Sequence, residues 1–140
     1  MDDNPNTTAH FTRESAVIAP ALWNPTVAGM WSVLLTPIFG SVVILKNWQS
    51  IGEQPRVKTG WAWLAVSVAM IIVFGATYWI HLIYLLTWYL AWPMKQARYV
   101  NERWGANYPK KSWVAPLLVG LGVLVALAVA LVGWLVVLQV

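Results

Sequence analysis

The chain lacks cysteine altogether and has few charged residues. Among its 140 residues there is no cysteine, and only nine Lys or Arg and five Asp or Glu are present. The absence of cysteine excludes disulfides, thiol catalysis and thiolate metal sites. Charged residues make up 10% of the chain and apolar residues 59%, whereas an ordinary soluble domain carries about 25% charged residues. This composition predicts an integral membrane protein.

Charge is absent above all from three long apolar blocks, which run from 27 to 45, from 61 to 92 and from 113 to 140. Each is long enough to span a hydrocarbon core of roughly 30 Å. As one helix, the central block would be about 48 Å long, too long for a single straight crossing. The segment from Gly75 to Trp79, near its middle, suits a tight turn at the lipid headgroups. We therefore expect two crossings here, as a full hairpin; a shallow re-entrant hairpin is the alternative.

Basic residues flank the central block on both sides. The first loop holds Lys46, Arg56 and Lys58, and the second holds Lys95, Arg98, Arg103, Lys110 and Lys111. Lys and Arg are enriched in the cytoplasmic loops of inner-membrane proteins. Two crossings of the central block place both loops in the cytoplasm, with the acidic amino-terminal tail and the carboxyl terminus outside. Because topology and anionic lipid explain the net charge of +4, we expect no nucleic-acid partner.

The predicted fold is all-α: a polytopic membrane protein with four transmembrane helices, of which the second and third form a tight hairpin. The helices are expected at about 25–47, 55–74, from 78 or 79 to about 104, and 112–140. Residues 1–23 are expected to form a polar and interfacial tail, and residues 24–140 the four-helix transmembrane domain. The acidic start of the sequence differs from the basic start of a cleavable signal, so the first block is expected to be a permanent anchor.

Small residues recur every four positions in two of the expected helices. The first helix contains Ala28, Ser32, Thr36 and Gly40, and the last contains Gly122, Ala126 and Ala130. Such faces let another helix approach closely, so both are candidate packing or partner-binding faces. Pro37 lies inside the first expected helix and is expected to kink it.

Residues that carry chemistry are scarce in the expected spans. Ion pumps and proton-coupled carriers place Asp, Glu, Lys or Arg within their spans, and none is found inside these apolar blocks. His81 could relay protons or bind a metal, but a hydrogen bond to a neighbouring helix is the favoured interpretation because no other ligand accompanies it. No nucleophile motif surrounds any serine or threonine. We therefore expect no catalytic, cofactor-binding or metal site.

The basic segment from Lys95 to Lys111 has two interpretations that the sequence leaves open. It either docks a cytosolic partner or anionic lipid, or it only fixes the topology. Several residues give the chain a resemblance to a family of small uncharacterised bacterial multi-pass membrane proteins. They are Trp31, Pro37, Gly40, Asn47-Trp48, Gly52, Gln96, Tyr99-Val100 and Tyr108. The resemblance implies a bacterial inner-membrane location and no particular activity.

The function expected from these observations is that of a non-enzymatic inner-membrane protein acting through lateral helix–helix contacts. The partner would be a membrane-inserting bacterial toxin, which would make the chain an immunity protein, or a larger membrane complex, which would make it an accessory subunit. The alternative is an oligomeric small-molecule carrier or exporter, with Tyr84, Trp88 and Tyr89 lining a path. The expected partners are therefore the lipid bilayer, another membrane protein or toxin, and further copies of the chain.

Overall fold

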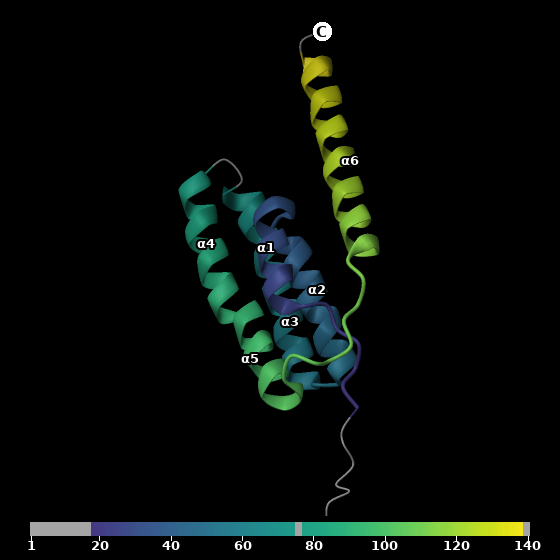
Figure 1. The fold of residues 1–140 in the computed structure, drawn as a ribbon. Helices are drawn as coiled ribbons and strands as arrows, with labels where there is room; N and C mark the ends of the chain where they lie inside the picture. The colour runs from purple at the N-terminus through teal and green to yellow at the C-terminus, as the bar shows by residue number, and fades with distance from the viewer. Residues whose placement is uncertain (1–17, 75–76, 139–140) are drawn as a thin grey trace, which may run out of the picture.

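The structure, a computed structural model, describes residues 18–74 and 77–138. Its helices in that part of the chain are α1 (Pro25–Leu35), α2 (Pro37–Ile51), α3 (Gln54–Phe74), α4 (Tyr78–Ala91), α5 (Pro93–Trp104) and α6 (Val114–Leu138). Helices α1 to α5 form a bundle, and α6 stands beside it and rises past its upper end (Figure 1). The predicted all-α class is confirmed for the described residues.

The first apolar block forms two helices. The prediction of one kinked helix over 25–47 is wrong, because α1 ends at Leu35 and α2 begins at Pro37. In a continuous helix Ser32 and Gly40 would lie about 12 Å apart. A Cβ atom added to Gly40 would instead collide with Ser32 Oγ. Helices α1 and α2 therefore form an antiparallel helical hairpin.

The reversal at Thr36 has a local cause. Proline disfavours the helical conformation in the residue before it, and it suits the first position of a new helix. Thr36 accordingly has φ 87° and ψ 153°, values that an L-residue rarely adopts. Pro37 thus ends one helix and begins the next, rather than bending a single helix.

The central block doubles back, as predicted. Helices α3 and α4 run antiparallel, since Ser67 Oγ lies 2.7 Å from the Tyr84 hydroxyl. The expected turn at Gly75–Trp79 falls partly outside the described residues, which omit 75 and 76, and α4 begins at Tyr78. The antiparallel arrangement of α3 and α4 therefore agrees with the prediction from the length of the central block and the basic residues beside it.

Helix α5 continues in the direction of α4 beyond the apolar block. The two helices are separated only at Trp92, because Pro93 has no N–H to donate to a carbonyl of α4. Helix α5 ends at Gly105, whose N–H donates to the Asn101 carbonyl at 2.9 Å and whose φ is 65°. The predicted helical extension as far as Gly105 is confirmed.

The segment before α1 lies at the same end of the bundle as the basic loops. The Leu22 N–H donates to the Pro109 carbonyl, and the Lys111 N–H donates to the Leu22 carbonyl, both at 2.9 Å. Leu22 is completely buried in a cluster with Val100 and Tyr108. The sequence predicts that the tail and the basic loops lie on opposite sides, whereas residues 18–23 lie beside the second basic loop, because the first block turns back on itself.

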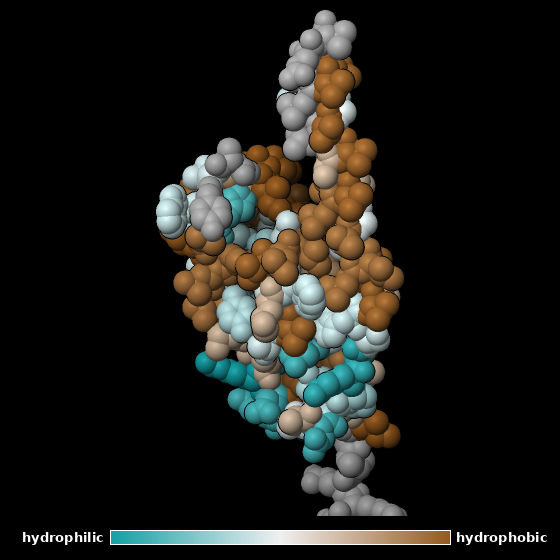
Figure 2. Space-filling view, turned by 45° about the horizontal axis from the view of Figure 1, so that its top comes forward, coloured by the Kyte–Doolittle hydropathy of each residue, from teal (hydrophilic) through white to brown (hydrophobic). Residues whose placement is uncertain are grey.

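Two of the described helices are long and apolar enough to cross a membrane. They are α3 and the Val114–Trp134 part of α6, whereas the sequence predicts four such helices. Helix α6 contacts the bundle near Gly120, where an added Cβ would meet Leu35 and Phe39 at 3.0 and 3.1 Å. Apolar surface covers the upper part of the molecule, and hydrophilic side chains gather at its lower end (Figure 2).

Candidate functional site

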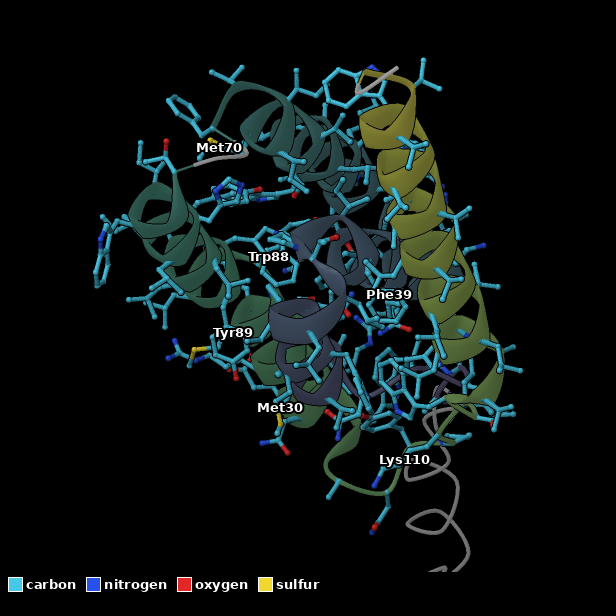
Figure 3. The ribbon with its side chains drawn as sticks, turned by 90° about the horizontal axis from the view of Figure 1, so that it is seen from above. Met30, Phe39, Met70, Trp88, Tyr89 and Lys110 are labelled. Atoms are coloured by element: carbon cyan, nitrogen blue, oxygen red, sulfur yellow. The ribbon has the colours of Figure 1, made fainter. Side chains whose placement is uncertain are left out.

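The predicted small-residue face of the first block lies inside the bundle. Ala28, Ser32 and Gly40 are buried, whereas Thr36 in the turn is half-buried. Ser32 of α1 and Gly40 of α2 face each other, with the Trp88 ring of α4 against Gly40. Trp88 points toward this hairpin in Figure 3. These residues therefore join α1, α2 and α4 to one another.

The second predicted face lies on the outside. Gly122, Ala126 and Ala130 are exposed, and nothing lies within 4 Å of a Cβ added to Gly122. Gly120 lies on another side of α6 and packs against Leu35 of α1 and Phe39 of α2; Figure 3 shows Phe39 beside α6. The described part of α6 has no buried residue.

A groove separates the lower part of α6 from α2. It has a volume of about 530 Å³ and apolar walls. Phe39 and Val43 line one wall, and Val119, Val123 and Leu127 line the other. Trp23 also lines the groove, and its Nε1 donates to the Ser112 carbonyl at 2.8 Å.

A buried amide pair joins the N-terminal segment to α2 and α5. Asn47 Oδ1 accepts from the Trp23 N–H at 3.0 Å, and Asn47 Nδ2 donates to the Trp23 carbonyl at 2.7 Å. The same Nδ2 donates to Gln96 Oε1 at 2.9 Å, and Gln96 Nε2 donates to the Ile44 carbonyl at 3.1 Å. Both side chains are completely buried. The pairing was not predicted from the sequence, although both residues belong to the resemblance.

A second buried network accounts for the hydroxyl groups of the interior. Trp88 Nε1 donates to Ser41 Oγ at 2.9 Å, Ser41 Oγ lies 3.1 Å from Ser67 Oγ, and Ser67 Oγ donates to the Trp63 carbonyl at 2.8 Å. The Ser67 hydroxyl has only one proton, so the Tyr84 hydroxyl donates to Ser67. Every hydroxyl and indole proton of this network then has an acceptor. This supports a packing role for these hydroxyls. His81 Nδ1 lies 3.2 Å from the carbonyl of Thr77, the residue before its own helix α4, so the predicted hydrogen bond to a neighbouring helix is wrong. The described residues hold no cluster of metal ligands.

The basic end carries a stack of aromatic and cationic groups. The Arg56 guanidinium lies 4.5 Å from the centre of the Trp48 ring and 4.3 Å from that of the Tyr99 ring. The Tyr99 hydroxyl donates to Glu53 Oε1 at 2.7 Å and accepts from Arg103 Nη1 at 3.0 Å. Burial, and then the Glu53 carboxylate, raise the pKa of Tyr99 above its ordinary value. Arg56 and Arg103, from the two separate basic loops, therefore meet at one ring.

The five predicted residues of the second basic loop divide into three groups. Lys95 and Arg98 line an open pocket of about 330 Å³ beside the stack. Arg103 binds Tyr99, as described above. Lys110 Nζ lies 5.9 Å from the centre of the Tyr108 ring, and Lys111 Nζ lies 4.4 Å from the centre of the Trp23 ring. Lys111 also donates to Ser50 Oγ at 3.1 Å.

Comparison of the chain with protein-family models, with curated proteins and with solved structures yields no match.

Proposed function

We propose that the chain is a non-enzymatic multi-pass protein of a bacterial inner membrane, and that it acts through lateral contact of α6 with a spanning helix of another membrane protein. The observation that carries this proposal is that the described part of α6, an apolar helix of 25 residues, has no buried residue. Its 25 residues correspond to about 37 Å, enough to cross the hydrocarbon core.

The proposed membrane arrangement follows from helix lengths and charge. Helix α3 corresponds to about 31 Å, and α4 returns beside it and is continued by Trp92 and α5. Helix α1 corresponds to only about 16 Å, so the α1–α2 hairpin enters the bilayer and leaves on the same side. The basic end faces the cytoplasm. We therefore propose three crossings, by α3, α4 and α6, together with a re-entrant hairpin.

The environment of Thr36 supports a re-entrant hairpin. Irregular backbone at membrane depth requires protein cover, because lipid offers its N–H and C=O groups no hydrogen bond. Thr36 is half-buried, and the neighbouring Leu35 packs against Gly120 of α6. Helix α6 thus shields one side of the turn while its opposite side stays free.

The proposed docking surface is defined by the exposed residues Gly122, Ala126 and Ala130. Apolar side chains alone gain nothing by leaving lipid for another helix, whereas small residues allow close backbone approach. The surface has no charge, so the partner helix should be uncharged where it docks. A membrane-inserting toxin and a subunit of a larger complex both present such a helix. The aromatics of the carrier alternative, Tyr84 and Trp88, are held in the buried hydroxyl network, so no observation favours that alternative.

Photo-crosslinking in native membranes tests this proposal. A photoreactive residue at Gly122 should give one discrete adduct with another protein. Ala126→Leu should abolish that adduct, because it fills the docking surface. Ala128→Leu is the matched control, since Ala128 is also exposed but lies about 160° away around the helix. An adduct only between two differently tagged copies, or equal adducts in both variants, would refute the proposal.

A further inference from the structure

The pocket beside the aromatic stack has the composition of an anion site. It is lined by Trp48 of α2, Arg56 of α3, Trp92 between α4 and α5, and four residues of α5, which are Lys95, Arg98, Tyr99 and Glu102. Three cationic side chains thus face a single carboxylate. Lys95 and Arg98 are three residues apart on α5 and so share one side of that helix.

The cations of the pocket are not neutralised within the protein. Lys95 and Arg98 are exposed, and neither forms a hydrogen bond or an ion pair with any residue of 18–74 or 77–138. Arg56 is held differently, because its guanidinium lies against both the Trp48 and the Tyr99 ring, whose centres are 5.1 Å apart. A stacked guanidinium keeps its N–H groups at its edge, where they can bind oxygen atoms in a bidentate manner.

Two buried indole groups form part of the pocket wall. Trp48 Nε1 and Trp92 Nε1 are both buried without a hydrogen-bond partner in the described part of the chain. The Trp48 side chain is 1% exposed and the Trp92 side chain 5% exposed. Both indole nitrogens are buried, so the two rings give the pocket apolar wall and offer no donor to a ligand inside it. The sign of the ligand therefore follows from the three cations.

We propose that this pocket binds a phosphate group, with Arg56, Lys95 and Arg98 as charge partners and the Trp48 and Trp92 rings as its wall. Phosphate offers several strong acceptor oxygens to the N–H groups of such cations. The pocket opens at the basic end, next to the junction where α4 ends at Ala91. That level suits the phosphate of an anionic lipid headgroup, and it also admits free phosphate. The proposal does not depend on the docking surface of α6.

The direct test follows the two indole N–H groups by NMR. The full chain is labelled with ¹⁵N at its tryptophan indoles in detergent, and the Trp48 and Trp92 signals are assigned from Phe variants. Inorganic phosphate and short-chain phosphatidylglycerol are added separately, with phosphatidylcholine, whose phosphate is offset by a quaternary ammonium, as the zwitterionic comparison. We expect the two assigned signals to shift with phosphatidylglycerol. A matching shift with inorganic phosphate identifies free phosphate as a ligand, and its absence identifies the lipid headgroup.

A charge-matched pair of variants separates the pocket from the general basic surface. Lys95→Gln with Arg98→Gln removes two cations from the pocket, whereas Lys58→Gln with Lys110→Gln removes two exposed cations that do not line it. The pocket pair should weaken phosphate binding about tenfold more than the control pair, because it removes charge-assisted hydrogen bonds as well as surface potential. Equal weakening by both pairs, or no shift of either indole with any probe, would overturn the proposal.

Discussion

The buried amide pair offers the sharpest test of how the first block is held in place. Asn47→Leu removes the side chain that binds both backbone groups of Trp23 and the Gln96 oxygen. Gln96→Met, of nearly the same shape as glutamine, removes the other member. The two substitutions leave different numbers of groups without a partner, so their effects on the free energy of unfolding should differ.

The magnitude follows from counting those groups. After Asn47→Leu, the Trp23 N–H, the Trp23 carbonyl and Gln96 Oε1 lose their partner, at about 1–3 kcal/mol for each fully buried group. Because Trp23 is only half-buried, we expect a total of about 3–5 kcal/mol. After Gln96→Met, Asn47 Nδ2 still donates to the Trp23 carbonyl, and the Ile44 carbonyl keeps its bond within α2. That variant should lose less than about 1.5 kcal/mol.

Unfolding in mixed micelles of a mild detergent and dodecyl sulfate measures both values, and a double-mutant cycle joins them. The double variant has no orphaned Gln96 oxygen, so it should be no less stable than Asn47→Leu alone, a non-additivity of about 1–2 kcal/mol. Gln49→Ala is the control, because Gln49 is exposed on α2 and should change stability by less than about 0.5 kcal/mol. Equal losses for Asn47→Leu and Gln96→Met, or additive losses in the double variant, would show that the network does not hold the hairpin.

Three further predictions concern packing, topology and pH. Gly40→Ala should destabilise the protein by about 1–3 kcal/mol, because the added Cβ collides with α1 and Trp88. Gly122→Ala should stabilise it by about 0.5–1 kcal/mol, because an added Cβ there meets no atom within 4 Å. Thermal unfolding in detergent compares the two variants. In intact cells, a cysteine at Ala21 should be protected from an impermeant thiol reagent and one at Thr77 should be labelled, and labelling of both would exclude the re-entrant hairpin. Because the pKa of Tyr99 is raised in the fold, its contribution to stability is complete below the ordinary tyrosine pKa of about 10 and is lost as pH rises beyond it; Tyr99→Phe should flatten this alkaline loss in unfolding experiments.

The sequence predicted the fold best where the structure depends on the distribution of charge and on residues that begin or end a helix. The length of the uncharged central block and the basic residues on both sides of it required the chain to double back. The structure accordingly brings Arg56 and Arg103 to the same ring. The start of α1 is equally local, because Asn24 accepts hydrogen bonds from the N–H groups of Thr26 and Val27. The helix end at Gly105 follows from the backbone freedom of glycine.

The candidate sites depended on contacts that no local pattern reveals. Asn47 and Gln96 are far apart in the sequence, and each taken alone resembles a polar residue at the edge of a span. The pocket combines residues from α2, α3 and α5 with Trp92 between α4 and α5, so its two unpartnered indoles become visible only after the chain has folded. The interleaved basic and aromatic residues after Lys95 indicated its position but not its geometry.

The sequence by itself determined that the chain is helical, apolar and folded back at its centre, because hydrophobic length and charge act without regard to distant partners. Only the tertiary structure decided that the first block reverses at Thr36 instead of continuing as one helix. A proline within an apolar stretch is compatible with a kink and with a reversal, and the choice rests on the fit of Ser32 and Trp88 against Gly40. Side chains from three helices must fit together for the reversal to form, and these side chains come into contact only in the folded protein.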